Sequence, residues 1–461
     1  MGLDLKIKKA DLDYSVEELK IKGKSFWPFF KVFFFDAQYV NGGTQTSFSV
    51  IQKLKFLSSA FFGWFNWLGK VEYLVFSNSD QRKLFEGQNI DKSADYVSLN
   101  LPNVLHIELP VFTHSSLKKM KFRRVVSHLP LRILESCYAK LFLRSTPILG
   151  QGVVDSLNAD FHTNLDALVI ARRFYAQYWV MKKLVAWKKP KAVFMVVPYM
   201  KSGYVLAAKE LNVTVIEMQH GTINKSHFGY ANYKKMDAQL YPDYLLSYGN
   251  GTQEVFCEGN ITFNQNQVIP IGHFYLHLIQ QQKMNFPREF QNVVNAEVSI
   301  SVSLQDDSVG KQIVPFLNEV AKKRPEWLMV FVPRKTGQSE YEKMNLAKNI
   351  LFLPSLNVYE TIKLCHIHTT VFSTCALEAP SIGRPNVLVN IDNKSKEYFS
   401  NLLSDMAVTR MVNTVDEFIA EIEKNDFPSE KYIRESNESI IKTGFVQNLN
   451  DAFVKMKIQT K

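Results

Sequence analysis

The sequence is poor in cysteine and contains no long apolar run. Only four of its 461 residues are cysteines, and their spacing is not that of metal ligands. So few cysteines in so long a chain favour a reducing, cytoplasmic setting over secretion. No transmembrane helix is predicted, because no stretch reaches about 20 uninterrupted apolar residues. Residues 1–22 are charged throughout and lack the apolar core of a signal peptide.

Acidic residues are outnumbered by basic ones. The chain has 55 Lys and Arg against 44 Asp and Glu, which gives a formal net charge of +11. This excess favours a partner that carries phosphates, such as a nucleotide or an anionic lipid. No motif of a nucleic-acid-binding family accompanies the charge, so nucleic acid is not expected as a partner.

One aromatic stretch lies close in sequence to a strongly basic one. Residues 56–68 read FLSSAFFGWFNWL, and residues 117–144 carry eight basic residues against one acid. A basic amphipathic helix beside an aromatic patch suits an anionic membrane surface. We therefore expect such a surface as a partner, with the protein cytoplasmic and peripheral on the inner membrane. A helix with solvated lysines and core aromatics explains the same pattern and stays an open alternative.

Short apolar runs alternate with helical patterns twice along the chain. Predicted strands at residues 192–197 and 213–218 enclose a predicted helix at residues 203–211, which makes a βαβ unit and a parallel sheet. The alternation restarts after a polar stretch, with strands predicted at residues 298–304, 328–332, 350–353, 368–372 and 385–389. The segment from Lys394 onward is predicted to be helical and charged.

These patterns predict an α/β protein of two domains. The predicted limits are residues 1–275 and 276–440, each with a parallel sheet. Residues 441–461 are predicted to form a C-terminal helix that packs back on the first domain. Two such domains imply a cleft between them, toward which the strand ends of both sheets face.

The most informative turn is Gln219-His220-Gly221, which directly follows a buried, β-branched strand. In open α/β sheets, reacting groups gather where the strands end at their carboxyl side. Histidine titrates near neutral pH and therefore suits the work of a general base. A lone histidine is often structural, so the role of His220 depends on a facing partner site.

The second domain offers a cationic turn after a predicted strand. Arg334, Lys335 and Gly337 stand in the sequence VFVPRKTG. Cations and a glycine at this place are suited to hold a diphosphate, arginine through paired hydrogen bonds. A surface turn with solvated cations is the alternative.

A second turn in this domain carries hydroxyls and a carboxylate. Ser373 and Thr374 precede a predicted helix, whose free N–H groups attract an anion, and Glu378 lies one turn into it. A carboxylate there could accept hydrogen bonds from two ribose hydroxyls, although simple capping explains Ser373 and Thr374 equally well. Ser303 and Gln305 close the first strand of the domain and are candidates for contact with the donor.

Weaker candidates complete the predicted site. Asp80 and Arg82 stand in a polar loop after a predicted strand, and His273 follows another strand. Together with Gln219 and Gly221 we expect them on the acceptor side or in the cleft. No metal site is predicted, because no Asp-x-Asp follows a strand, and a metal-independent mechanism is expected.

Two segments resemble a known family. Residues 216–230 contain IEMQHGTIN and HFGY, and residues 370–385 read TVFSTCALEAPSIGRP. They resemble bacterial glycosyltransferases of the GT-B fold from capsular polysaccharide or lipopolysaccharide synthesis, which are distantly similar to CDP-glycerol glycerophosphotransferases. The resemblance implies two Rossmann-like domains, the first on the acceptor side and the second binding a nucleotide-sugar. It also implies that His220 is the base and that Ser373, Thr374, Glu378, Gly383 and Pro385 form the donor end.

The sequence departs from this family at one position. Such enzymes carry a His-Pro pair where Arg334 and Lys335 stand here. We predict a metal-independent, inverting glycosyltransferase with a nucleotide-sugar as co-substrate, no further cofactor, and a glycan or lipid-linked glycan as acceptor. A sugar-nucleotide 2-epimerase of the same fold and a non-catalytic scaffold protein are the alternatives.

Overall fold

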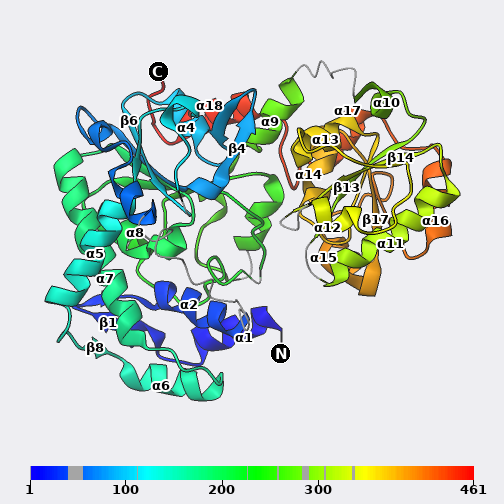
Figure 1. Cartoon of the computed structure of the whole chain (residues 1–461). Coiled ribbons are helices and arrows are strands. Elements are labelled where there is room, and N and C mark those ends of the chain that lie inside the picture. Colours follow the sequence, from blue (N-terminus) through cyan, green and yellow to red (C-terminus); the bar gives the residue numbers. More distant parts are fainter. Residues whose placement is uncertain are drawn as a thin grey trace. The chain divides into compact units, whose positions relative to one another are not determined.

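The computed structural model describes residues 2–39, 55–111, 113–225, 227–256, 259–282, 290–305, 308–334 and 338–461. The chain divides into two compact units (Figure 1). Unit 1 comprises Met1–Ser247, Gly251–Pro270 and Gln447–Lys461, and unit 2 comprises Tyr248–Asn250 and Ile271–Val446. The domain limits expected from the sequence stay predictions.

Unit 1 is built on a seven-stranded parallel sheet in the order β12-β11-β10-β9-β3-β6-β7. The strands are buried on both faces, which explains their nearly continuous apolar sequences. Their bounds are Tyr73–Asn78 for β3, Val104–Leu109 for β6, Val125–Ser127 for β7, Ala192–Met195 for β9, Thr214–Met218 for β10, Tyr244–Ser247 for β11 and Val268–Pro270 for β12.

Helices cover this sheet, and an aromatic core fills the space between them. Phe29, Phe30 and Phe34 of α2 are buried, and the Phe29 ring lies 5.8 Å from that of Phe174 in α7. Buried Lys31 is paired with Asp11, 3.1 Å away. The helices of the unit are α1 (Leu3–Leu12), α2 (Trp27–Tyr39), α4 (Asp95–Asn100), α5 (Leu129–Phe142), α6 (Gln151–Asp160), α7 (Ala167–Lys188) and α8 (Ser202–Glu210).

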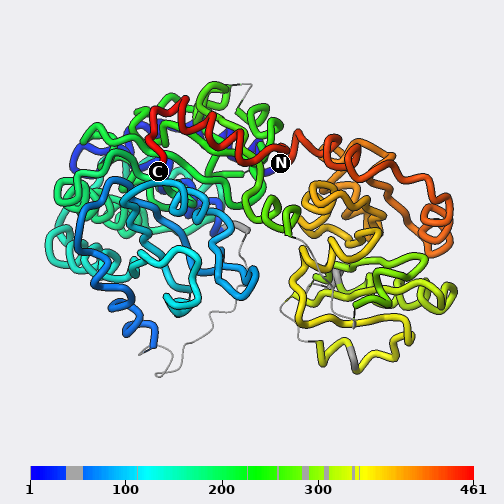
Figure 2. Tube along the Cα trace, turned by 90° about the horizontal axis from the view of Figure 1, so that it is seen from above, coloured from blue at the N-terminus to red at the C-terminus, as the bar shows by residue number. Residues whose placement is uncertain are grey.

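The C-terminal segment of the chain belongs to unit 1. It comprises Gln447–Lys461, contains most of α18 (Phe445–Lys455) and is red in Figure 2. Lys455 donates to the Asn266 carbonyl at 2.9 Å, and the Lys461 amide donates to the Asn100 carbonyl at 3.0 Å. Smaller elements of the unit are β1 (Lys20–Ile21), β2 (Lys24–Ser25), β8 (Ile148–Leu149) and the hairpin of β4 (Arg82–Phe85) and β5 (Gln88–Asp91).

Unit 2 carries a six-stranded parallel sheet in the order β15-β14-β13-β16-β17-β18. Its strands are β13 (Ser299–Ser303), β14 (Leu328–Val332), β15 (Ile350–Phe352), β16 (Ile367–Thr369), β17 (Asn386–Val389) and β18 (Thr409–Val412). Its helices are α9 (Phe274–Gln281), α10 (Gln291–Val294), α11 (Ser308–Lys323), α12 (Gln338–Glu342), α13 (Val358–Leu364), α14 (Cys375–Ile382), α15 (Lys394–Phe399), α16 (Val415–Glu423) and α17 (Glu430–Ser436).

The predicted fold class, two α/β domains with parallel sheets, is confirmed. Two local predictions are wrong. The segment after Lys394 is not helical throughout, because β18 pairs with β17 and completes the sheet. Residues 117–144 do not form one basic helix, since only α5 is helical at length and β7 precedes it. Among the described helices, none is long and apolar enough to cross a membrane.

Candidate active site

His220 lies just beyond β10, at the carboxyl end of a central strand of unit 1. Its Nδ1 atom is buried, and among the described residues nothing forms a hydrogen bond with it. Burial, together with the charges of nearby His227, Lys201 and Lys92, lowers the pKa of His220 to about 4. The imidazole is therefore neutral at pH 7 and has a nitrogen lone pair available to accept a proton.

The neighbouring strand ends in a strained turn. Val197 follows β9 with φ 57° and ψ 57°, the left-handed region that β-branched residues strongly disfavour. Such strain costs about 1–3 kcal/mol and is concentrated at functional sites. The turn places Tyr199 with its ring centroid 6.5 Å from that of His220 and 5.3 Å from that of His227.

Two buried ionisable groups lie beside this turn. The Lys201 ammonium donates to the Val196 carbonyl at 2.8 Å, and burial lowers the pKa of Lys201 to about 8. Glu217, on β10, accepts a hydrogen bond from Tyr230, and burial raises the pKa of Glu217 to about 8. Both groups can therefore exchange a proton near neutral pH, which is the property expected of acid–base residues.

A small cavity reaches Glu217. It has a volume of about 20 Å³ and is lined in part by Tyr199, Glu217 and Tyr230. That volume holds about one water molecule. Sequence reasoning missed five residues of this region, because only the sheet brings them close to His220. They are Tyr199, Lys201, Glu217, His227 and Tyr230. The nearest signal in the sequence was His227, the histidine of HFGY.

The residues on either side of His220 shape its turn. The Gln219 side-chain amide donates to the Gly221 carbonyl at 2.8 Å, and the Gln219 backbone amide donates to the Leu246 carbonyl at 3.1 Å. A Cβ atom at Gly221 would meet no atom within 4 Å, so the backbone there does not require glycine. Asp80, just after β3, is exposed and is close enough to Lys201 to act on its charge.

Arg82 lies in a separate, buried cluster of charges. It pairs with Glu108 and lies 3.7 Å from Asp95. His106 Nε2 lies 3.7 Å from Asp91 and 2.6 Å from the Ser77 hydroxyl. Burial raises the pKa of both Asp91 and Asp95.

This cluster also contains the one set of possible metal ligands among the described residues. Ligand atoms of Asp91, His106 and Glu108 lie within 4.8 Å of one another. Glu108 is already engaged by Arg82 and, at 2.8 Å, by His114. We therefore interpret the cluster as an internal charge network, and the predicted independence from metal stays a prediction.

In unit 2, Ser303 and Gln305 connect two strand ends. The Ser303 hydroxyl lies 2.9 Å from His368 Nε2, and the Thr370 hydroxyl donates to the Ser303 carbonyl at 2.8 Å. The Gln305 side-chain carbonyl accepts from the Phe372 amide at 3.1 Å. These contacts fix the start of the turn that leads to Ser373 and Thr374.

That turn ends in α14, and its polar groups lie at the start of the helix. The Ser373 hydroxyl accepts from the Cys375 amide at 3.3 Å, whereas the side chain of Thr374, the N-cap residue, makes no capping bond. Glu378 is half-buried in the first turn and accepts from the Tyr359 hydroxyl at 3.0 Å. The structure thus brings Gln305, Ser373 and Glu378 together around one end of the sheet.

The remaining candidates are Arg334, Lys335, Gly337 and His273. Arg334 is exposed directly after β14, whereas Lys335 and Gly337 lie outside the described residues. His273 is buried and caps α9, because its Nδ1 accepts from the Leu276 amide at 3.3 Å. The His273 side chain therefore stabilises the start of α9.

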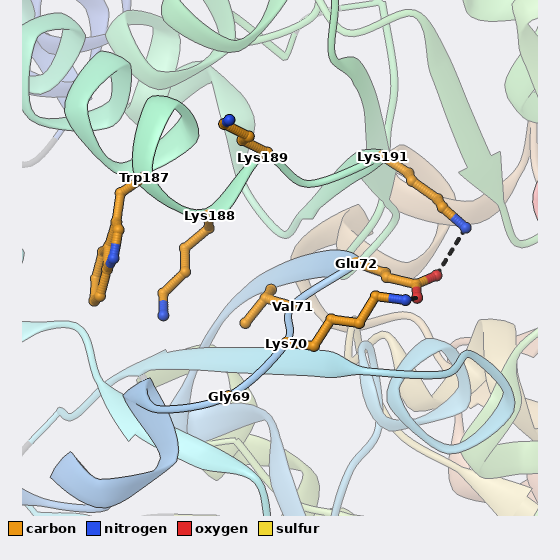
Figure 3. Close-up of a pocket in the computed structure, with 8 residues that line it drawn as sticks. All are labelled: Gly69, Lys70, Val71, Glu72, Trp187, Lys188, Lys189 and Lys191. Atoms are coloured by element: carbon orange, nitrogen blue, oxygen red, sulfur yellow. Dashed lines mark ion pairs between the residues drawn. The ribbon is translucent and has the colours of Figure 1, made fainter.

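A larger hollow lies at the opposite end of the unit 1 sheet from His220. It has a volume of about 410 Å³ and is lined by residues that precede β3 and β9, among them Lys70, Glu72 and Lys188 (Figure 3). Reactions in open parallel sheets take place at the carboxyl ends of the strands. Despite its size, this hollow is therefore not the candidate active site.

No family model and no curated protein matches the sequence. Solved structures do match the fold. A glycosyltransferase from Rickettsia africae has a TM-score of 0.50 at 10% identity, covering 85% of this chain and 100% of that one. A UDP-GlcNAc 2-epimerase from Neisseria meningitidis bound to UDP-GlcNAc gives 0.49 at 11% identity, over 84% and 100%. The lipopolysaccharide outer core galactosyltransferase WaaB, in its apo form, gives 0.46 at 12% identity, over 83% and 99%.

These likenesses define a class of fold. The chain has a GT-B-like fold of two Rossmann-like units, as the sequence predicts. The solved structures named above include a glycosyltransferase and a UDP-GlcNAc 2-epimerase that was solved with UDP-GlcNAc bound. At such low identities the likeness shows the fold alone, and the reaction has to be argued from the site.

Proposed function

We propose that this protein is a nucleotide-sugar-dependent glycosyltransferase that inverts the anomeric centre and needs no metal. The observation that carries the proposal is His220, a neutral imidazole at the carboxyl end of β10 whose buried Nδ1 has no hydrogen-bond partner among the described residues. A base at this position can take the proton of an acceptor hydroxyl. The acceptor is proposed to be a glycan or lipid-linked glycan of a bacterial surface polysaccharide.

In the proposed reaction, the acceptor oxygen bonds to the anomeric carbon of the donor sugar while the bond from that carbon to the phosphate oxygen breaks. The hydroxyl proton passes to His220, and the nucleotide diphosphate leaves with the electron pair of the broken bond. Its charge grows in the transition state, so positive groups and backbone N–H groups that face it lower the barrier. We assign this stabilisation to Arg334, Lys335 and Gly337 with the start of α14, and the ribose contact to Glu378.

The low pKa of His220 fits this scheme. With a pKa of about 4, the free side chain is a weak base. An anionic diphosphate nearby favours the protonated form and raises the pKa of the imidazole. His220 would therefore become a stronger base once the donor is bound.

A thermal-shift screen with CMP-, CDP-, UDP-, GDP- and TDP-linked sugars tests donor binding. At a donor concentration of 100 times Kd, the expected stabilisation is about 2.7 kcal/mol. A shift for one nucleotide class identifies the donor and directs the transfer assay. No shift with any of them would refute the proposal and favour the scaffold alternative.

A 2-epimerase is the second candidate, and one specific observation favours it. Glu217 and Lys201 both have a pKa of about 8 and lie near His220. Epimerisation at carbon 2 requires one group that removes a proton and another that returns it. Incubation with UDP-N-acetylglucosamine alone separates the two reactions, because an epimerase forms the C2 epimer without any acceptor.

A further inference from the structure

An exposed aromatic surface lies on one side of unit 1. We call it the aromatic face and define it by Phe61, Trp64, Phe65, Leu68 and Trp187. Their exposed fractions are 75%, 64%, 53%, 69% and 61%. Single exposed apolar residues are ordinary, but a group of large ones that lie together marks an interaction surface.

Two distant segments are joined in this face. Phe61 and Trp64 stand in the short helices η2 (Ser59–Phe61) and η3 (Trp64–Trp67), whereas Trp187 is at the end of α7. The rings of Trp67 and Trp187 are stacked with centroids 6.1 Å apart, and Lys188 donates to the Trp67 carbonyl. The face is therefore a product of tertiary structure.

The backbone holds the aromatic side chains outward. Gly63 has φ 64°, and a Cβ atom there would lie 2.0 Å from the Val125 carbonyl oxygen. The Asn66 amide donates to the carbonyls of Val125 and Arg123 at 3.0 and 3.1 Å. Beneath the face, the Phe62 ring stacks on His114 at 4.1 Å. The segment thus covers the edge strand β7 as an ordered turn, and the exposed aromatics are not a frayed loop.

Positive charge borders the aromatic face. The hollow of about 410 Å³ beside Trp187 is lined by Lys70, Lys188, Lys189 and Lys191 (Figure 3). Glu72, the acid in this lining, already pairs with Lys70 and Lys191. Arg124 adds a further cation, and it donates to the carbonyls of Lys70 and Leu68 at 2.8 and 3.0 Å.

The cations around the hollow repel one another, and this adds to the effect of burial on the pKa of Lys188. Burial lowers the pKa of Lys188, and the charge of Arg124 lowers it further. An anion in the hollow would offset this repulsion. Aromatic side chains flanked by lysines are typical of proteins that lie at the level of lipid headgroups.

We infer that the aromatic face docks on a membrane that carries anionic lipids, with the headgroup phosphates beside Lys70, Lys189 and Lys191. The proposed function supplies only the setting of this inference, a lipid-linked acceptor. Along the sheet, β7 is four strands from β10, a separation of about 19 Å. His220 lies at the carboxyl end of β10, so a lipid-linked glycan has to span at least this separation to reach it.

Sedimentation of the full chain with vesicles tests the inference. Binding is expected with phosphatidylcholine vesicles that contain 30% phosphatidylglycerol, and at least about tenfold weaker binding with phosphatidylcholine alone, since each lysine near an anionic surface contributes about 1 kcal/mol. Trp64→Ala with Trp187→Ala is expected to weaken binding at least about tenfold, because two large apolar side chains no longer enter the interface. Lys70→Gln, Lys189→Gln and Lys191→Gln together should abolish the preference for anionic vesicles.

Matched changes elsewhere provide the controls. Met406→Ala with Val454→Ala removes two other exposed apolar side chains, and Lys322→Gln, Lys396→Gln and Lys431→Gln remove three exposed charges from unit 2. Both controls should bind like the native chain, and circular dichroism should show every variant folded. No binding of the native chain, or equal losses in test and control variants, would overturn the inference. Self-association that is lost in the tryptophan variant, without vesicle binding, would assign the face to a protein partner.

Nucleotide thermal shifts are recorded on the same samples. Vesicle binding can therefore be absent while the donor binds, or be present while no donor binds. The two proposals are separated by these readouts.

Discussion

The two turns that carry the candidate site follow strands of the same kind but hold different chemistry. After β9 and β10 in unit 1 stand a strained backbone at Val197 and the ionisable Lys201 and His220, with Glu217 near the end of β10. After β16 in unit 2 stand Ser373 and Thr374 at the start of a helix, where Thr374 has an ordinary φ of −59°. Groups that exchange protons are thus collected in unit 1, and groups suited to bind phosphate and ribose in unit 2. The proposed function assigns the two turns different tasks, and the following variants test this assignment.

The largest effect is expected from His220→Ala. Loss of a general base lowers the rate of transfer about 10²–10⁴-fold, while donor binding, which the comparison assigns to unit 2, should persist. Transfer is measured with radiolabelled donor, and binding by calorimetry. If the variant loses donor binding, or transfers sugar at the native rate, the assignment of the general base to His220 in unit 1 is wrong.

The next effect concerns pH and Glu217. In the folded protein this carboxyl keeps its proton up to about pH 8, whereas its ordinary value is 4.5. The folded state therefore binds more protons between these values, and the free energy of unfolding falls as pH rises through this window. Between pH 5 and 8, Glu217 should lower the free energy of unfolding of the native protein by on the order of a few kcal/mol. The Glu217→Gln variant should lack this decrease.

Urea unfolding of both proteins at each pH measures this difference. Identical pH profiles for Glu217→Gln and the native chain would show that the carboxyl is not buried as described. Asp91 and Asp95 contribute in the same direction in both proteins, so they cancel in the comparison.

A smaller effect is expected from Glu378→Gln in unit 2. Loss of a hydrogen bond to a charged acceptor costs about 1.5–3 kcal/mol, or roughly 10- to 100-fold in donor affinity. We expect KM for the donor to rise with little change in kcat. Glu435→Gln, on the exposed side of α17, is the control. A fall in kcat at constant KM would move Glu378 into the chemistry and weaken the proposed division.

The smallest effect is expected from Val197→Asn. Asparagine tolerates the left-handed backbone region, so relief of strain should stabilise unit 1 by about 1 kcal/mol. If the strain positions Tyr199 and Lys201, transfer should slow while donor affinity stays unchanged. A less stable variant with full activity would show that the turn is not strained.

Much of the fold could be predicted from the sequence. The strand predicted at residues 328–332 is found at Leu328–Val332, and most other predicted strands of unit 2 are found within a residue or two of their limits. Apolar runs of this length between polar turns involve only neighbouring residues, so they can be recognised in the sequence without knowledge of the tertiary structure. The aromatic residues of α2 (Trp27–Tyr39), by contrast, pack against α7, a contact that depends on the tertiary structure.

The candidate site was only partly predictable. His220, Ser373 and Glu378 stand at strand ends or helix starts, which the order of elements already indicates. Arg82 and His273 carried the same signal, yet one is buried among carboxylates and the other caps a helix. Their chemistry depends on which residues pack around them, and no spacing in the sequence records that.

The sequence by itself determined the class of fold and the two polar turns, because alternating apolar runs and turn residues act over a few neighbours. Only the tertiary structure decided the ionisation of the site and the aromatic face. Burial shifts the pKa of His220, Lys201 and Glu217, and stacking joins Trp67 to Trp187 across 120 residues of chain. Both effects depend on contacts between distant segments, which exist only once the sheet of unit 1 has formed.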